Sequence, residues 1–462
     1  MLTRPLGKLQ PMSTTRQRPH ILVVGGGYVG LFTALRLQQK LQPGEAAVTV
    51  IEPQSYMTYQ PFLPEAAAGN LEPRHVVVPL RRVLPQVQVL NGQVTRIEHS
   101  RRVVEFLPDA GDSCELSYDV LVMAAGSVPR TLPIPGLAEW GVGFKNVGEA
   151  IYLRNHVLSR LDIAASTTDV ELRRKALTFV FVGAGYAGVE ALAELEDMAR
   201  EACRYYENIY PADMRWVLVE ATDRILPEVG PQMGEYTVTQ LRERGIEVRR
   251  ETLLKSAENR HIVLSDGDEF DADTLVWTAG VKPSPLVQAS DLATDQKGRV
   301  KATEFLTVEG TDDAWTAGDT AAVPDLTGGP GAYCGPSAQH AVRQAKLLGD
   351  NIVGTLRGKT PKPYVHAYAG SVASLGLHQG VAQIYGVKLR GWPAWFVHRT
   401  YHVSRVPTFN RKARVVADWT LALFFRREIV SLGALQHPRE EFEFALKPPL
   451  EGGKLQPERT PV

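Results

Sequence analysis

Residues 21–30, ILVVGGGYVG, decide the fold of the amino-terminal part of the chain. Four β-favouring residues lead into a glycine-rich turn, a helical pattern follows, and a second apolar strand ends on Glu52. This order is the βαβ unit that binds dinucleotides, because the start of the helix offers free N–H groups and a positive dipole to a pyrophosphate. The ligand contacts expected from this unit are Gly25, Gly26, Gly27, Tyr28, Gly30 and Glu52.

The same arrangement occurs a second time in residues 176–192, ALTFVFVGAGYAGVEAL, and the strand that follows ends on Glu220. Residues near 198–213 are expected to extend the helix, which explains the longer distance from glycines to acid. One glycine fingerprint is a weak signal, whereas two, each between a strand and a helix, indicate two dinucleotide sites. The alternative is two structural turns in a large α/β protein. The ligand contacts expected from the second unit are Gly183, Gly185, Gly188 and Glu220.

Three further apolar strands end on small residues or a turn, in residues 120–126, 274–280 and 314–319. Buried parallel strands that end in tight turns account for all three, and small residues there leave room for a bound cofactor. Asp319 could also be an ordinary turn residue. The cofactor contacts expected at these strand ends are Ala125, Gly126, Ala279, Gly280, Gly318 and Asp319.

Composition narrows the class of protein. The 462 residues are 44% apolar and 22% charged, which is typical of a globular protein with a large core. Lys+Arg 51 balances Asp+Glu 51, so no global field indicates nucleic acid. Three cysteines without a CxxC argue against a disulfide framework and against a cysteine zinc site, and no metal is expected. The sequence lacks a run of 18 apolar residues, so a spanning helix is not expected.

The carboxy-terminal region changes character. Residues 361–387 suit a small antiparallel sheet, and residues 388–427 are rich in arginine, lysine and aromatic side chains. Two short helices are expected near residues 392–406 and 411–427, although Arg399 interrupts the aromatic side of the first. Basic and aromatic residues without a spanning run predict amphipathic helices that lie on a membrane surface. A basic dimer face or nucleic-acid face is the alternative.

Two glycine units, matched strand ends and a late Gly-Asp turn resemble the flavoproteins with two dinucleotide domains, over residues 19–350. Within that superfamily, the chain is most similar to the type II NADH dehydrogenases. The similarity is carried by TYQPFLPEAAAGNLEP, by Glu190 after the second glycine turn, and by AQHAVRQ, which matches the AQxAxxQ quinone motif. One departure is Ala369, where many members have a lysine, so any proton role of that lysine is absent or transferred.

The resemblance implies an α/β fold with FAD and NADH as cofactors, a quinone as substrate, and a peripheral position on the cytoplasmic face of the cell membrane. A homodimer is compatible with the sequence. The implied domains are a flexible tail (1–18), an FAD-binding domain in two parts (19–145 and 286–350), an NADH-binding domain (146–285), a membrane-associating region (351–437) and a second flexible tail (438–462).

The resemblance also implies roles for individual residues. The amides of Gln339 and Gln344 would donate to the quinone carbonyls, although a solvated face is the alternative for Gln344. Pro336 would stand in the first turn of a helix whose amino terminus faces the flavin. Glu190 would supply a proton or orient the nicotinamide or flavin, and Glu220 would select NADH over NADPH.

Two other functions stay open at this point. A sulfide:quinone oxidoreductase would need reactive cysteines, and Cys334 lies where it could approach the flavin. A redox sensor that binds NADH and FAD would lack steady turnover with quinone.

Overall fold

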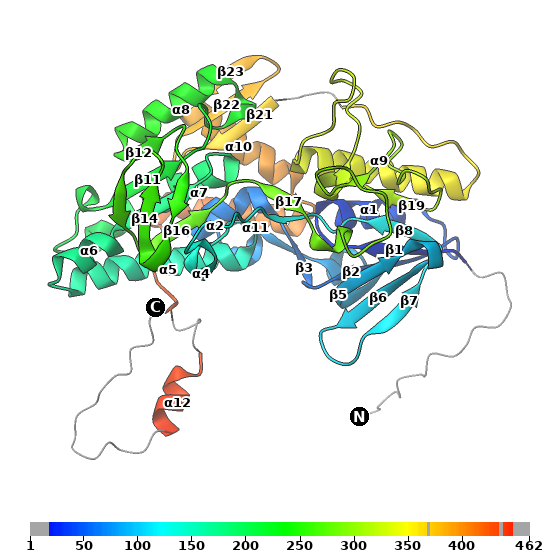
Figure 1. Ribbon diagram of the computed structural model, residues 1–462, viewed down its shortest axis with the longest axis horizontal. Helices are drawn as coiled ribbons and strands as arrows, with labels where there is room; N and C mark the ends of the chain where they lie inside the picture. Colours follow the sequence, from blue (N-terminus) through cyan, green and yellow to red (C-terminus); the bar gives the residue numbers. More distant parts are fainter. Residues whose placement is uncertain (1–17, 367–369, 434–437, 447–462) are drawn as a thin grey trace.

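The computed structural model describes residues 18–366, 370–433 and 438–446. Two sheets, the first mixed and the second parallel, stand at opposite ends of the molecule (Figure 1). The first has the strand order β19-β8-β1-β2-β5-β6-β7. Its strands are β1 (His20–Val24), β2 (Ala47–Glu52), β5 (Gln88–Glu98), β6 (Val103–Pro108), β7 (Cys114–Ser117), β8 (Val120–Met123) and β19 (Ala314–Thr316). Helices α1 (Tyr28–Lys40) and α9 (Ala338–Leu356) pack against each other beside this sheet.

The second sheet has four parallel strands in the order β12-β11-β10-β16. Its strands are β10 (Thr178–Val182), β11 (Arg215–Val219), β12 (Ile246–Arg249) and β16 (Thr274–Trp277). The strand before each glycine turn has neighbours on both sides: β1 lies between β2 and β8, and β10 lies between β11 and β16. The strand order reverses at these positions, which is where dinucleotides bind in such sheets. The predicted fold, α/β with two Rossmann-like units, is confirmed.

Helices α5 (Val147–Ser166), α7 (Tyr186–Ala202) and α8 (Pro231–Glu243) accompany the second sheet. The expectation that residues near 198–213 extend the helix is confirmed only as far as Ala202, where α7 ends. Two short 3₁₀ turns follow, the second beginning at Pro211, whose ring removes a backbone donor. The loop between them is held by Asn208, whose Nδ2 donates to the carbonyl of Ala165 at 2.9 Å.

Smaller elements complete and connect the two units. Strand β17 pairs antiparallel with β9 and so joins one unit to the other. The remaining elements before residue 330 are β3 (Tyr56–Thr58), β4 (Val77–Pro79), β9 (Ser127–Pro129), β13 (Leu254–Ser256), β14 (His261–Leu264), β15 (Glu269–Asp271), β17 (Val281–Pro283), β18 (Val300–Lys301), β20 (Ala321–Ala322), α2 (Leu63–Ala67), α3 (Leu80–Val83), α4 (Leu137–Trp140) and α6 (Val170–Ala176).

The carboxy-terminal region contains the expected sheet and helices. Strands β21 (Gly370–Ser374), β22 (Gly380–Ile384) and β23 (Val387–Arg390) form an antiparallel sheet. Helices α10 (Trp392–Arg405) and α11 (Phe409–Phe424) follow, close to the predicted bounds. The predicted tail after residue 437 is wrong in part, because α12 (Glu440–Leu446) forms there, whereas the predicted amino-terminal tail lies almost wholly outside the described residues. Within the described ranges, no helix is both long and apolar enough to cross a bilayer.

Arg399 turns inward and does not interrupt a surface pattern. Its Nη2 donates to Glu65 Oε2 of α2 at 2.7 Å, and its guanidinium lies over the rings of Trp395 and Trp419 at 4.1 and 4.8 Å. Trp419 Nε1 donates to the same carboxylate oxygen at 2.7 Å. Removing one member of a buried charge pair costs several kcal/mol. Arg399 therefore fixes α10 and α11 to the body of the protein.

Candidate active site

The first glycine turn forms a cradle at the start of α1. Gly25 has φ +103°, and a Cβ there would lie 2.4 Å from the carbonyl oxygen of Ala124. At Gly30 a Cβ would lie 1.7 Å from the carbonyl oxygen of Gly25, so α1 packs directly on the turn. A Cβ at Gly27 would meet no atom of the described residues within 4 Å. The space at Gly27 and the uncapped helix start fit a pyrophosphate.

Glu52 holds this turn from the neighbouring strand. Its Oε2 accepts from Gly26 N at 2.5 Å, and its Oε1 accepts from Gln54 N at 3.1 Å. Burial raises the pKa of Glu52, while these two backbone donors oppose the rise. The carboxylate is therefore placed at the rim of the cradle, where the ribose of a dinucleotide would lie.

The second glycine turn repeats this geometry at the start of α7. Gly183 has φ +105°, a Cβ at Gly188 would lie 1.9 Å from the carbonyl oxygen of Gly183, and Gly185 faces open space. Glu220 Oε2 accepts from Ala184 N at 2.8 Å, and its Oε1 accepts from the N and Oγ1 of Thr222 at 2.9 Å each. The two cradles are equivalent, so the residues present fit two dinucleotides.

The Gly-Asp turn closes the first cradle. Gly318 N donates to Gln344 Oε1 at 2.8 Å, and Asp319 Oδ2 accepts from Ser127 Oγ at 2.6 Å. Lys145 Nζ donates to the same hydroxyl at 2.5 Å. Gln344 is buried, which argues against the alternative of a solvated face, and its side chain contacts the turn and Cys334. No sequence signal marked Ser127 or Lys145, because their partners are remote in the chain.

The other predicted strand-end residues lie beside the cradles. Gly126 and Gly280 have φ +66° and +89°, and a Cβ on either would meet no described atom within 4 Å. Ala125 and Ala279 precede them and are half-buried. Small residues at these four positions keep the carboxyl ends of β8 and β16 open toward a ligand.

Helix α9 begins at Ala338, after the proline that was predicted to stand in its first turn. Ser337 is the cap, and its Oγ accepts from His340 N at 3.1 Å, so Pro336 precedes the helix and is not in its first turn. A proline can adopt the extended backbone before a cap without losing a helical hydrogen bond. On the first turn, Gln339 Nε2 donates to the carbonyl oxygen of Gly370 at 3.2 Å.

Glu190 lies at the other end of β21 from Gln339. Its Oε1 accepts from Ser374 N at 2.8 Å and lies 3.1 Å from His398 Nε2 of α10. Gly370 and Ser374 are four positions apart along the strand, which corresponds to about 13 Å at the usual rise per residue. The structure thus brings Glu190 and Gln339 to one strand without direct contact.

Burial sets the protonation of this pair. Loss of solvent raises the pKa of Glu190 to about 8, although the Ser374 N–H opposes the rise. Burial, and secondarily the charge of Arg399, lowers the pKa of His398 to about 3. Near neutral pH the carboxyl therefore holds a proton and the imidazole is neutral. Ala369, the position of the family lysine, lies outside the described residues.

The cysteines do not form a redox centre among the described residues. All three are free; Cys114 is exposed, and Cys203 and Cys334 are buried. Burial raises the pKa of both buried thiols to about 11, so the reactive thiolate is disfavoured at neutral pH.

Comparisons with known proteins show the family of the chain. A family model described as pyridine nucleotide-disulphide oxidoreductase matches residues 19–345. The type II NADH:quinone oxidoreductase of Staphylococcus haemolyticus is 30% identical over 396 residues, which are 85% of this chain and 96% of that protein. The chain belongs to the type II NADH:quinone oxidoreductases. The Mycobacterium tuberculosis member of this family is 28% identical over 435 residues, or 90% of this chain and 91% of that protein.

The fold is shared with a solved member. The structure of NDH2 from Plasmodium falciparum in complex with NADH matches with a TM-score of 0.82 at 18% identity, covering 89% of this chain and 100% of that chain. Because it belongs to the type II NADH:quinone oxidoreductases, the chain is an oxidoreductase that uses FAD and NADH and reduces a quinone. These relatives give no support to the sulfide:quinone oxidoreductase or to the redox sensor.

A glycine pair tests the second cradle. Gly185→Ala should fold normally but raise the Kd for NADH about ten- to a hundredfold, because a methyl group in the cradle displaces phosphate contacts of about 1.5–3 kcal/mol. Gly188→Ala, the matched control, should lower the melting temperature because its Cβ would meet the carbonyl oxygen of Gly183. Calorimetric titration with NADH and thermal melting measure both effects. Unchanged NADH affinity in Gly185→Ala would contradict the assignment of the cradle.

Proposed function

We propose that the two cradles divide the dinucleotides, with FAD on the first and NADH on the second. Bound FAD supplies the electron carrier between the two substrates. The support is the Gly-Asp turn, because Asp319 belongs to the first cradle and is fixed there by Ser127. The residues assigned to FAD are Gly25, Gly26, Gly27, Tyr28, Gly30, Glu52, Ala125, Gly126, Gly318 and Asp319. Those assigned to NADH are Gly183, Gly185, Gly188, Glu220, Ala279 and Gly280.

Glu220 is assigned the choice of nucleotide. Three hydrogen bonds from Ala184 and Thr222 hold its carboxylate at the end of β11. A carboxylate there accepts the ribose hydroxyls of NADH and repels the 2′-phosphate of NADPH.

Gln339 is assigned to the quinone. A side-chain amide has two N–H donors, and Gly370 takes one of them, which leaves the second for a quinone carbonyl. The amino terminus of α9, after Pro336 and Ser337, adds a positive dipole on the same side. Gln344 is reassigned from the quinone to the Gly318–Asp319 turn, because its buried side chain accepts from Gly318 N and contacts Cys334.

Glu190 is assigned as proton donor. Reduction of a quinone by NADH takes up one proton from solution for each quinol formed. A buried carboxyl that is protonated near neutral pH can supply this proton, and its hydrogen bond to Ser374 and contact with His398 fix its direction. An orienting role toward nicotinamide or flavin is the alternative.

Replacing Glu190 separates these two roles. Glu190→Gln keeps the shape and the acceptor but cannot give up a proton, so it should slow quinone reduction about 10²- to 10⁴-fold. NADH should still bleach the flavin at the normal rate. In the unchanged enzyme, quinone reduction should fall as pH rises through about 8, where Glu190 loses its proton, and the variant should lack this step.

Stopped-flow measurement of both half-reactions across pH decides between the roles. Glu201→Gln, on the same helix but partly exposed, is the matched control and should behave as the unchanged enzyme. A Glu190→Gln variant that keeps the pH step near 8 would show that another group delivers the proton.

We further propose that α10 and α11 dock the enzyme on the cytoplasmic face of the cell membrane. Their apolar side chains are exposed although Arg399 fixes both helices to the core. The cytoplasmic leaflet is rich in anionic lipids, which attract the basic residues beside this surface. A homodimer stays a prediction. The exposed apolar residues of this surface are Trp392, Phe396, Phe409, Val416, Leu421, Leu423, Phe424 and Phe425.

Vesicle binding tests this surface. Changing Leu423 and Phe424 together to Ser should reduce partitioning onto anionic vesicles at least about tenfold, because each side chain contributes about 1.5–3 kcal/mol when buried. The matched control changes Val170 and Leu172 of α6, which are also exposed, to Ser. Sedimentation with vesicles of mixed zwitterionic and anionic lipid measures binding. Equal loss in both double variants, or no loss in either, would contradict the assignment.

A further inference from the structure

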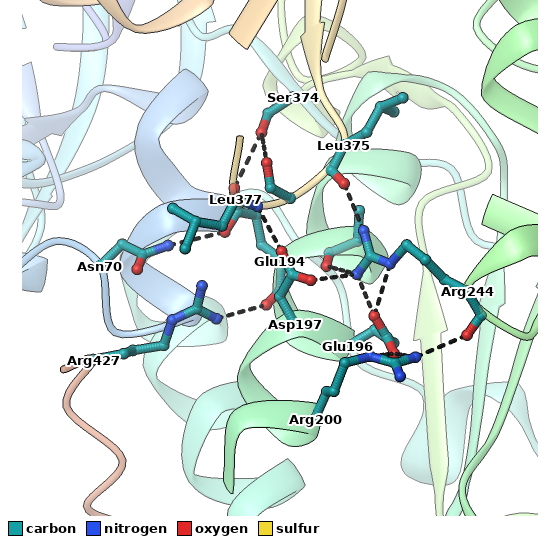
Figure 2. Close-up of polar contacts among 12 residues, drawn as sticks. Asn70, Glu194, Glu196, Asp197, Arg200, Arg244, Ser374, Leu375, Leu377 and Arg427 are labelled. Carbon is teal, nitrogen blue, oxygen red and sulfur yellow. Dashed lines mark hydrogen bonds and ion pairs between the residues drawn. The ribbon is translucent and has the colours of Figure 1, made fainter. Parts of the chain in front are cut away.

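Helix α7 carries three acids in a row. Glu190, Glu194 and Asp197 are four and three residues apart, so they share one face of the helix. They face the turn that connects β21 to β22, residues 374–379. Figure 2 shows Glu194 and Asp197 beneath this turn, with hydrogen bonds from the Ser374 hydroxyl and from the backbone N–H of Leu377. The spacing is visible in the sequence, but the turn that meets it lies 180 residues away.

Hydrogen bonds join the row to the turn. Ser374 contacts two of the acids, because its N–H donates to Glu190 Oε1 at 2.8 Å and its Oγ donates to Glu194 Oε1 at 3.1 Å. Leu377 N donates to Asp197 Oδ2 at 2.5 Å. Ser374 is therefore a polar link between the buried Glu190 and the next acid of the row.

The row runs from the interior to solvent. The Glu194 residue is 0% exposed, whereas the Asp197 side chain is 21% exposed. Asp197 lines a surface pocket of about 380 Å³ together with Arg200, Gln240 and Arg244. Asp197 lines this pocket, whereas Glu190 is buried and is not among its lining residues.

Burial and the neighbouring charges shift the pKa of the acids in this row. Burial is the main cause that raises the pKa of Glu194. The charge of Glu65 adds to this rise, and the charges of Arg427 and Arg399 oppose it. Arg244 lies 2.9 Å from Asp197, yet burial still raises the pKa of Asp197 to about 6, with Glu194 adding to the rise and Arg427 opposing it. His398 faces Glu190. Burial thus raises the pKa of all three carboxyls, so each holds a proton at a higher pH than a solvent-exposed acid does.

We propose that Asp197, Glu194 and Ser374 form a relay that carries protons from the solvent pocket to Glu190. The proposal rests on the proton-donor role proposed for Glu190. Asp197 takes a proton from water and passes it to Glu194. Glu194 gives its proton to Ser374 Oγ while the hydroxyl gives its own to the ionised Glu190, so one proton moves and Ser374 is unchanged. Rotation of the Ser374 side chain carries the hydroxyl toward Glu190, which its own N–H already contacts.

In the relay, Ser374 is a positioning residue that acts through Glu190, and substitutions of its hydroxyl test this role. Ser374→Ala removes the hydroxyl but keeps the N–H bond to Glu190, Ser374→Thr restores a hydroxyl, and Ser371→Ala is the matched control on the same strand. The readout needs no turnover: flavin-loaded enzyme is transferred to D₂O, and the infrared band of the Glu190 carboxyl is followed as it exchanges. Glu190→Gln identifies this band by removing it.

The relay predicts slow exchange in Ser374→Ala, about tenfold or more below the unchanged enzyme, with normal rates in Ser374→Thr and Ser371→Ala. Quinone reduction in Ser374→Ala should fall most at high pH, where proton supply limits the reaction, while NADH bleaches the flavin normally. Glu194→Gln, which cannot carry a proton, should slow exchange in the same way and serves if Ser374→Ala does not fold.

Other outcomes overturn the relay. Normal exchange in a folded Ser374→Ala or Glu194→Gln variant would contradict the relay. In that case, slow quinone reduction in Glu190→Gln would still support the proton-donor role of Glu190. If the unchanged enzyme has no carboxyl band that Glu190→Gln removes, Glu190 holds no proton, and the proposed role and the relay both fail.

Discussion

Strand β21 is held at its two ends by side chains of the two dinucleotide units, and this double attachment organises the site. Gln339 of α9 binds Gly370 at one end, and Glu190 of α7 binds Ser374 at the other. Helix α9 packs on α1 of the first unit, whereas α7 begins at the second glycine cradle. A buried N–H without its acceptor costs about 1–3 kcal/mol, so the bond to Glu190 keeps the strand in register with both units.

The carboxyls buried near this strand are tolerated because each is paired, hydrogen-bonded or protonated. Buried charges are costly unless they are paired or protonated. Glu65 is paired with Arg399 and Asp197 with Arg244, whereas Glu190 has only neutral His398 and a backbone donor and therefore keeps its proton. Glu194, which is also buried, has the neutral partners Asn70 and Ser374, and Glu190 is the protonated carboxyl that binds the strand between the two cradles. Its cost in stability is consistent with a chemical use.

Local pattern was enough to predict the two cradles. Each glycine, and the acids Glu52 and Glu220, acts within one strand–turn–helix–strand unit. The interacting residues are therefore close together in the sequence. Helices α10 and α11 were also predicted, because their composition differs from the rest. Residues whose role depends on remote partners were not predictable in this way. Gln344 is buried by its bond to Gly318, and Arg399 by Glu65, 334 residues distant. Ser374 carries no motif at all.

The central claim is that one chain passes electrons from NADH to a quinone through its flavin, and an anaerobic two-step titration tests it most directly. The purified, flavin-loaded protein is mixed first with one equivalent of NADH and then with one equivalent of a soluble quinone, while flavin absorbance is recorded. The account predicts full bleaching in the first step and full recovery in the second, with one quinol formed for each NADH consumed. Bleaching by NADH that the quinone does not reverse would contradict it.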